Sequence, residues 1–437
     1  MSSPTTTLAA PAELDSGLEA ATMRRVGRRL LPLLFCLYIV CFIDRTNVGV
    51  AALQMNRDLG FSAAVYGLGA GIFFLGYALF EVPSNLILAR VGARRWISRI
   101  AITWGVLATA MMFVRSAESF YTMRFLLGVA EAGYFPGIVY YLSHWFPERR
   151  RARAISRFAI GVPLAGGVGG PLGAALLGLD GNQGLAGWQW LFLIEGIPAA
   201  ILGLVALRYL TDRPEDARWL PAAERAWLIQ RLETERRASA GLGHATFRQA
   251  LASPTLWWLC APYTLFALSN LALILWLPLL LKEQLAVSDQ RVGWILGLIG
   301  VASAAGMLLI GVSSDGRGDR IRHAAGALAL GAVGCAAAAL ASQPILAVTG
   351  LALAMVGTTA FLPIFWCLPT TILRGTAAAG GIALINSIGN VGGFVGPNLL
   401  GQVKDATGSF TAGLLALAGL TLAGAGLTLR LRRRLGR

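Results

Sequence analysis

The sequence predicts an all-α integral membrane protein with twelve transmembrane helices, arranged as two pseudo-symmetric bundles of six. Hydrophobic residues make up 56% of the 437 residues and charged residues only 14%, and the mean hydropathy is +0.64. A soluble domain is rarely so apolar. About twelve apolar stretches of roughly 20 residues recur along the chain. Motifs in the first half also recur in the second half at a constant sequence offset.

Each apolar stretch is long enough to cross a bilayer, because about 20 helical residues span roughly 30 Å of hydrocarbon. Short segments that are charged or rich in glycine and proline separate the stretches. We expect transmembrane helices at 30–52, 61–84, 96–114, 120–143, 154–178, 188–210, 255–281, 291–313, 323–341, 344–367, 374–402 and 411–430.

The formal net charge of +15 reflects membrane topology. Basic residues gather in every second loop, whereas a nucleic-acid-binding protein concentrates them on one face. With the N-terminus in the cytoplasm, roughly 30 Lys and Arg residues lie inside and about five outside, a strong positive-inside bias. The pattern predicts cytoplasmic N- and C-termini and no nucleic-acid partner.

A charged segment in the middle of the chain divides the two sets of six spans. It contains Trp219, Leu220, Trp227 and Leu228 near helical spacing, which predicts an amphipathic helix on the membrane surface, with a plain tether as the alternative. No cleavable signal peptide is expected before the first span. The expected parts are a cytoplasmic tail (1–24), a first bundle (25–210), a linker (211–254), a second bundle (255–430) and a basic tail (431–437).

The two halves share motifs at one offset, which indicates a duplicated six-helix unit. Ala89–Arg94 after the second span aligns with Asp315–Arg320 after the eighth, and 315 − 89 = 226. Gly166-x-x-x-Gly170-Pro171 aligns with Gly392-x-x-x-Gly396-Pro397, and 392 − 166 = 226. Parallel repeats of this kind build one large class of secondary transporters. By itself, Gly-x-x-x-Gly most often allows close helix packing.

Neither a metal site nor a bound cofactor is expected. Five cysteines lie inside apolar spans without the spacing of metal ligands, so they read as small buried hydrophobic residues: Cys36, Cys41, Cys260, Cys335 and Cys367. The phosphate-binding pattern Gly-x-x-x-x-Gly-Lys-Ser/Thr is absent from the sequence, which argues against an ATPase.

A few ionisable residues interrupt the apolar spans and are the candidate functional groups. Each ionised group near the bilayer centre costs about 3 kcal/mol, so such residues are usually paired or functional. They are Asp44, Arg45, Glu81, Arg124, Glu131 and Glu195. Glu195 lies beside Gly196 and is interpreted as a helix-packing residue, and Glu81 is expected to meet basic loop residues.

Depth along the helices suggests how these charges combine. Arg124 and Glu131 are seven residues apart, so they share one helix face about 10 Å apart. Asp44 and Arg124 both fall within roughly 10 Å of the outer edge and Glu131 lies near the midplane. This depth permits an Asp44–Arg124 pair and leaves Arg45 and Glu131 nearer a central site. A purely structural ion network is the alternative.

The second half offers polar but uncharged groups. The offset maps Asp44 onto Asn270, since 44 + 226 = 270, and Glu131 onto Gly357, since 131 + 226 = 357. Trp366, Asn386 and Asn390 also lie in its spans. We therefore expect a small organic anion to be held by Arg45 or Arg124, with amides of the second half contacting its hydroxyl groups.

Together these segments resemble the major facilitator superfamily, and within it the anion:cation symporter branch of tartrate, phthalate and sugar-acid transporters. The resemblance covers almost the whole chain after residue 25. The stretches that carry it are "FIDRTNVGVAAL", "GYALFEVPSNLILARVGARRWI", "RFLLGVAEAGYFPGIVYYLSHWFP", "GLAGWQWLFLIEGIPA", "YLTDRPEDARWL" and "GGIALINSIGNVGGFVGPNLLGQVKDATGSF".

The resemblance implies roles for particular residues. It makes Asp44 and Glu131 proton carriers, Arg45 and Arg124 carboxylate partners and gating groups, and Tyr77, Trp366 and Asn386 substrate contacts. The branch's loop motif corresponds to Arg90, Gly92 and Arg94 in the first half and to Asp315, Gly318 and Arg320 in the second. Ala89 stands where the motif normally has an acid, so a weaker latch is expected in the first half.

The implied activity is secondary transport: proton-coupled symport of a small organic anion such as tartrate, a sugar acid or an aromatic carboxylate, by alternating access. Protons are then the coupling ion, the lipid bilayer and the anion are the partners, and a monomer in the bacterial inner membrane suffices. Exchange or uniport on the same fold, a channel and a non-transporting sensor are the alternatives. No enzymatic activity is expected.

Overall fold

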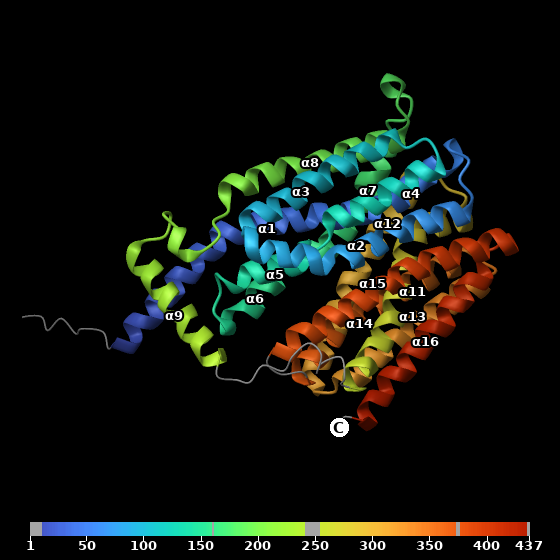
Figure 1. Ribbon diagram of the computed structural model, residues 1–437. Helices are drawn as coiled ribbons and strands as arrows, with labels where there is room; N and C mark the ends of the chain where they lie inside the picture. The colour runs from blue at the N-terminus through green and yellow to red at the C-terminus, as the bar shows by residue number, and fades with distance from the viewer. Residues whose placement is uncertain (1–10, 160, 241–253, 373–375, 435–437) are drawn as a thin grey trace, which may run out of the picture.

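A computed structural model of the chain describes residues 11–159, 161–240, 254–372 and 376–434, and its regular elements are helices (Figure 1). The first half contains α1 (Pro11–Asp58), α2 (Ala63–Val91), α3 (Ala93–Ala110) with η1 (Met111–Phe113), α4 (Ala117–Glu131), α5 (Tyr134–Ser143), α6 (Glu148–Ala159), α7 (Gly161–Leu177), η2 (Asn182–Gly184) and α8 (Gly187–Tyr209). The linker contains η3 (Pro214–Asp216) and α9 (Ala222–Ala240).

The second half has a simpler series of long helices. They are α11 (Pro254–Leu285), α12 (Asp289–Arg317), α13 (Arg320–Leu340), α14 (Pro344–Ile372), α15 (Thr376–Thr407) and α16 (Thr411–Arg434). In Figure 1 the blue and green helices of the first half form one bundle and the yellow to red helices form the other. We call the end where α1 begins and α16 ends the termini end, and the end with loops 59–62, 178–186 and 286–288 the hairpin end.

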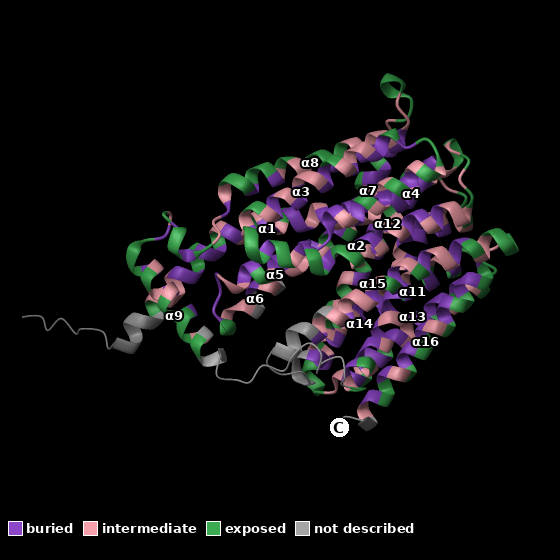
Figure 2. Cartoon of the chain, in the orientation of Figure 1, coloured by how far each residue is buried: buried purple, intermediate pink, exposed green. Residues whose placement is uncertain are grey.

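Apolar surface covers the outside of both bundles, as lipid contact requires. Within the described residues, ten helices are long and apolar enough to cross a membrane, and α7 contributes a shorter apolar helix at Leu164–Leu177. Leu309 and Val312 on α12 are 72% and 73% exposed, and Figure 2 shows exposed residues along the outer helices. With α15, these helices give twelve membrane-crossing segments, so the predicted two-bundle membrane fold is confirmed.

The two bundles meet along the antiparallel helices α2 and α15. At the hairpin end, Asp405 accepts hydrogen bonds from the backbone N–H groups of Ala63 (3.0 Å) and Ala64 (2.8 Å), the first residues of α2. Farther along the same pair, Asn386 Nδ2 donates to Glu81 Oε1 (2.8 Å). The helices therefore stay in contact from the hairpin end to Glu81.

The glycine motifs that suggested the repeat pack in two different ways. In the first half, Gly166 and Gly170 on α7 lie against α12 of the other bundle, where Gly293 and Gly300 approach them closely. In the second half, Gly396 on α15 lies against Leu268 of its own bundle. The offset thus marks equivalent helices. The glycines of the first copy pack across the bundle interface, whereas Gly392 and Gly396 of the second pack within their own bundle and Pro397 of that motif approaches the other bundle at Gly67.

Several boundaries differ from the predicted ones. The predicted span 120–143 is two helices, because the chain leaves helical geometry at Ala132 and Gly133. The span 154–178 is divided between α6 and α7. The first helix starts at Pro11, within the segment expected to be a tail. The predicted linker helix is present as α9, which packs Leu228 and Leu232 into the first bundle's core, while 241–253 lie outside the described residues.

Candidate functional site

Arg45 on α1 forms an ion pair with Glu131 at the end of α4. Arg45 Nε donates a hydrogen bond to Glu131 Oε1, and the Cys41 thiol donates to the same oxygen at 2.8 Å. The Glu131 side chain is fully buried and the Arg45 side chain is 20% exposed. A buried pair of this kind is electrically neutral as a unit, so removing either charge leaves the other poorly compensated.

The break between α4 and α5 positions Glu131. Ala132 is extended and Gly133 has a φ of 81°, a left-handed conformation that glycine adopts without strain. A side chain at Gly133 would also be crowded, since its Cβ would lie 2.6 Å from Ser84 Oγ. Glu131 is therefore the last residue of a helix, which sequence periodicity did not predict.

Asp44 points away from its neighbour Arg45, because consecutive helical residues are about 100° apart around the axis. Trp104 Nε1 on α3 donates to Asp44 Oδ2 at 2.8 Å, and Asn47 Nδ2 donates to Oδ1 at 3.2 Å. Asp44 is 2% exposed. The two adjacent charged side chains thus point in different directions: Arg45 faces Glu131, and Asp44 faces the interior of the first bundle.

Arg124 is buried against α2 and forms no ion pair with Asp44 in the described structure. Its Nε and Nη2 lie 3.4 Å and 3.3 Å from the carbonyl oxygens of Gly69 and Ala70, to which they donate. Its guanidinium also lies 4.8 Å from the centre of the Phe73 ring. The Asp44–Arg124 pair that depth permitted is therefore wrong for this structure, and Arg124 instead holds the α2 backbone.

Aromatic rings surround the Arg45 guanidinium. Its central carbon lies 5.0 Å from the Tyr77 ring, 5.6 Å from Phe42 and 5.9 Å from Phe73. Such contacts favour a planar cation while leaving its edge free for a carboxylate. Tyr77, predicted as a substrate contact, therefore lies next to the predicted carboxylate partner.

The predicted residues of the second half fall into two groups. Asn270 is buried and donates from Nδ2 to Thr358 Oγ1 at 3.1 Å, within its own bundle. Trp366 packs edge-to-face on Tyr263 with ring centres 5.0 Å apart, and the Tyr263 hydroxyl donates to Asn386 Oδ1 at 3.5 Å. Asn390 follows Asn386 by one turn on the same helix. Trp366 and Asn386 thus form one cluster, which does not include Asn270.

Glu81 belongs to this cluster, although the sequence placed it near loop arginines. That expectation is wrong: Glu81 is 5% exposed, Asn386 donates to its Oε1, and Ser387 Oγ donates to its Oε2 at 3.2 Å. In the sequence, the charge of Glu81 within an apolar span was the signal that it could belong to a site. Its partners are about 300 residues away in the chain, and periodicity carries no information about which helices meet.

Glu195, interpreted as a helix-packing residue, is a buried carboxyl on α8. It is 5% exposed, and the Asn47 amide of α1 is a polar neighbour of its carboxyl group. Gly196, beside it, packs against Thr109 of α3. The packing interpretation thus fits the neighbouring glycine, while the carboxyl itself faces Asn47.

The loop motifs at the termini end show how the missing acid is replaced. Asp212, which follows α8, accepts a hydrogen bond from the Arg94 backbone N–H at 2.7 Å, and its other oxygen lies 3.9 Å from Arg94 Nε. Gly92 and Gly318 have φ values of 98° and 66° in the two turns. Asp212 thus anchors the first turn, which carries alanine at position 89.

In the second copy of the loop motif, the acid and the arginine face each other. Asp315 lies 3.8 Å from Arg320 Nη2, and its side chain is 75% exposed. Arg90, the first basic residue of the first copy, is exposed. The predicted gating residues therefore lie at the loops of their own bundles.

Comparisons with known proteins agree with this architecture. Residues 34–397 match the family model for the Major Facilitator Superfamily. The chain is 48% identical over 420 residues to a protein of Agrobacterium vitis named "Putative tartrate transporter", with 96% of each chain covered. It is 43% identical over 410 residues to "Putative metabolite transport protein NicT" of Pseudomonas putida, with 93% of each covered.

A solved structure shares the fold at low sequence identity. It is the crystal structure of a bacterial homologue of the human lysosomal transporter Spinster, in an inward-facing and occupied conformation. The TM-score is 0.76 at 20% identity, over 92% of this chain and 96% of that one. The family model and the close relatives carry the assignment. The chain belongs to the major facilitator superfamily and is a multi-pass membrane transporter, not an enzyme.

Proposed function

We propose that this transporter is a proton-coupled symporter of a small organic anion, and that the Arg45–Glu131 ion pair couples the two. Arg45 is permanently charged and largely buried, with its side chain 20% exposed, so an anionic partner stabilises it at each stage of transport. In the structure that partner is Glu131. When Glu131 takes up a proton, the carboxylate of the substrate can replace it.

The cost of an unpaired charge sets the strength of this coupling. Leaving one member of a buried ion pair without its partner costs about 3–5 kcal/mol, a factor of roughly 10² to 4 × 10³ in an equilibrium constant. Protonation of Glu131 without substrate is therefore unfavourable, and so is substrate binding without the proton. Together they again pair the Arg45 charge with a single carboxylate.

Other residues complete the proposed site. Asp44 is proposed as a second proton site, because it is buried and accepts only neutral hydrogen-bond donors, Trp104 and Asn47, as shown above. Tyr77 lies beside Arg45 and is proposed to contact the substrate, with Trp366, Asn386 and Asn390 closing from the second bundle. Roles for Arg124 and Asn270 in substrate binding stay predictions. Arg90, Gly92, Arg94, Asp315, Gly318 and Arg320 remain the predicted loop latch.

The substrate class is proposed from the relatives and the charges together. A relative named as a tartrate transporter supports a hydroxy-dicarboxylate, and sugar acids or aromatic carboxylates fit the same arginine and amide groups. The positive-inside pattern supports cytoplasmic termini in a bacterial inner membrane. A complete site within one chain supports a monomer.

Uptake into proteoliposomes tests the proposal. Purified protein in sealed vesicles should accumulate labelled tartrate when an inward proton gradient is imposed, and should not respond to an inward sodium gradient. A thermal-shift screen with sugar acids and aromatic carboxylates identifies the best ligand if tartrate fails, because a bound ligand stabilises the folded state. Accumulation driven by sodium, or exchange without accumulation under any gradient, would overturn proton symport.

A further inference from the structure

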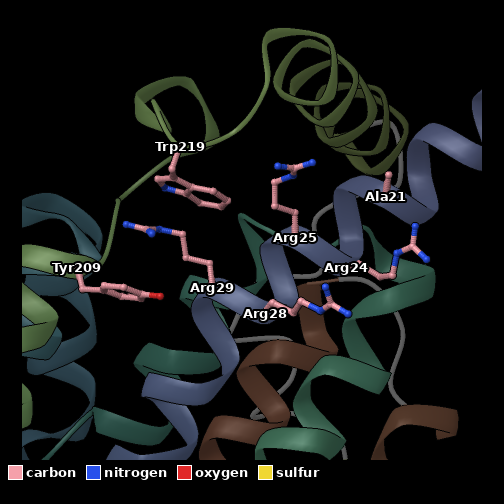
Figure 3. Close-up of a pocket in the computed structure, with 7 residues that line it drawn as sticks. All are labelled: Ala21, Arg24, Arg25, Arg28, Arg29, Tyr209 and Trp219. Carbon is pink, nitrogen blue, oxygen red and sulfur yellow. The ribbon is translucent and has the colours of Figure 1, made fainter.

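A basic pocket opens at the termini end, away from the proposed transport site. Its volume is about 600 Å³, and it lies between the first turns of α1, the end of α8 and the segment before α9 (Figure 3). Four arginines of α1 line it, together with Ala21, Tyr209 and Trp219. These arginines are Arg24, Arg25, Arg28 and Arg29, and we call the cavity the arginine pocket.

Arg29 is fixed in place at the back of this pocket. Its guanidinium lies 4.3 Å from the Tyr209 ring and 5.1 Å from the Trp219 ring, and Figure 3 shows it between them. Trp219 is itself held by a hydrogen bond from its Nε1 to Thr211 Oγ1 (3.2 Å) and by stacking on Trp145. Arg29 Nε has no hydrogen-bond partner among the described residues.

The pocket carries an excess of positive charge. Arg25 Nε pairs with Glu224 Oε2 on α9 at 3.2 Å, whereas Arg24 and Arg28 are exposed and form no ion pair with a described residue. Four arginines and one glutamate leave 4 − 1 = +3. Charges this close repel one another, so an anion with several acceptor oxygens would be stabilised here.

A neighbouring cavity indicates that the anion also carries an apolar chain. On the next face of α1, a cavity of about 180 Å³ shares Arg24 with the arginine pocket. Met23, Gly27 and Leu31 line one side of it at steps of one helical turn. Phe146, Arg150 and Ala154 line another side, and Arg150 is neutralised by an ion pair with Glu19 (2.9 Å). Leu31 is already in the apolar span that begins near residue 30. The apolar groove therefore leads from the arginines into the membrane.

The depth of the pocket also fits a lipid headgroup. Tyr209 is the last residue of the membrane-crossing helix α8, and aromatic residues at helix ends lie at the membrane–water interface. Phosphate groups of phospholipids lie at the same depth. A soluble anion would gain nothing from the adjoining apolar groove.

We propose that the arginine pocket binds the headgroup of an anionic phospholipid, with Arg24 and Arg28 contacting its phosphate and one acyl chain lying along Met23, Gly27 and Leu31. The bound headgroup offsets the repulsion among the arginines and holds α9 against α1. This site is separate from the transport site and does not depend on the proposed symport.

Lipid exchange on the full-length protein tests the proposal. The protein is reconstituted in nanodiscs of phosphatidylcholine alone or with phosphatidylglycerol of the same acyl chains, and thermal unfolding and the number of retained lipids are measured. Phosphatidylglycerol should raise the unfolding temperature, and Arg24→Gln/Arg28→Gln should lower its affinity roughly 30-fold, about fivefold for each charge removed. The control Arg95→Gln/Arg317→Gln, on exposed arginines at the same end, should retain the wild-type affinity.

Three outcomes would overturn the lipid site. Equal stabilisation by both lipids would show that charge is not recognised. The same stabilisation by inorganic phosphate or glycerol phosphate in detergent would make this a site for a soluble anion. If the pocket variant and the control variant lose the same affinity for phosphatidylglycerol, the effect comes from general surface charge and not from the pocket. Unfolding temperatures in phosphatidylcholine alone check that each variant is folded, and Arg24→Gln alone provides a milder variant.

Discussion

Replacing Glu81 by glutamine should strengthen substrate binding, because Glu81 occupies hydrogen-bond donors that the substrate needs. Glu81 accepts hydrogen bonds from Asn386 (2.8 Å) and Ser387 (3.2 Å), and Asn386 is a proposed substrate contact. An anionic substrate must displace this internal carboxylate or bind beside it against charge repulsion. Glutamine keeps the size of the side chain and removes its charge.

The expected gain follows from the two hydrogen bonds. A hydrogen bond to a charged acceptor contributes about 1.5–3 kcal/mol and a neutral one about 0.5–1.5 kcal/mol. If each of the two hydrogen bonds is weakened by about 1 kcal/mol, releasing the donors from residue 81 costs roughly 2 kcal/mol less. This difference corresponds to about 30-fold in substrate affinity. The bundle contact through α2 and α15 should weaken by a similar amount.

Calorimetric titration of the purified protein with tartrate, or with the best ligand of the thermal-shift screen, measures the effect. Glu81→Gln should bind about 30-fold more tightly than wild type near neutral pH. Glu118→Gln, which removes an exposed carboxylate at the hairpin end, is the matched control and should leave affinity unchanged. Unchanged or weaker binding by Glu81→Gln, in protein that unfolds as cooperatively as wild type, would refute the competition and leave Glu81 as a structural residue.

Three further predictions concern Arg45, Glu131 and Asp405. Arg45→Lys should lower substrate affinity at least about tenfold in calorimetry, because lysine lacks the planar pair of donors; wild-type affinity would mean that the charge is structural. Glu131→Gln should abolish proton-driven accumulation in proteoliposomes but retain substrate exchange, and unimpaired accumulation would remove Glu131 from the proton pathway. Burial raises the pKa of the Asp405 carboxyl, but hydrogen bonds from the Ser62 hydroxyl and the first N–H groups of α2 outweigh it and hold that pKa below its usual value. A carboxyl whose pKa is lowered in the folded state stabilises the fold above the unfolded-state pKa near 4, and this effect is lost as the pH falls through the folded-state pKa. Asp405→Asn should therefore lower the unfolding temperature at pH 7, by the equivalent of about 1 kcal/mol or less. The difference from wild type should shrink steadily as the pH is lowered below about 4.

The helices were predictable because lipid exposure imposes a simple pattern on the chain. An apolar stretch of the right length has few alternatives to a transmembrane helix. The break at Ala132 and Gly133 was not predictable in the same way, since both residues are also common within membrane helices. Its cause is tertiary: Gly133 lies against Ser84 of α2, where no larger residue fits.

The sequence predicted roughly how deep the site residues lie in the membrane, but it did not predict the direction in which their side chains point. Counting residues left Arg45 and Glu131 as the groups nearer a central site, and the structure shows that they form an ion pair, which the count did not predict. The same count allowed Asp44 to meet Arg124, but Asp44 faces Trp104 and Arg124 faces the α2 backbone. Height along a helix does not fix rotation about its axis, because rotation depends on which helices pack together. Contacts between the halves, such as that of Glu81, depend on the same missing information.

The α2–α15 pair carries a carboxylate contact toward each of its ends, so hydrogen bonds join the two helices at two separate places. Asp405 holds the hairpin end through Ala63, and Glu81 holds Asn386 18 residues farther along α2, about 27 Å away. A rocking motion that separates the two helices at one end breaks the hydrogen bond at that end and leaves the one at the other end in place. Because the two acids lie toward opposite ends of the molecule, each end of the bundle interface depends on a different carboxylate: Asp405 at the hairpin end and Glu81 toward the termini end.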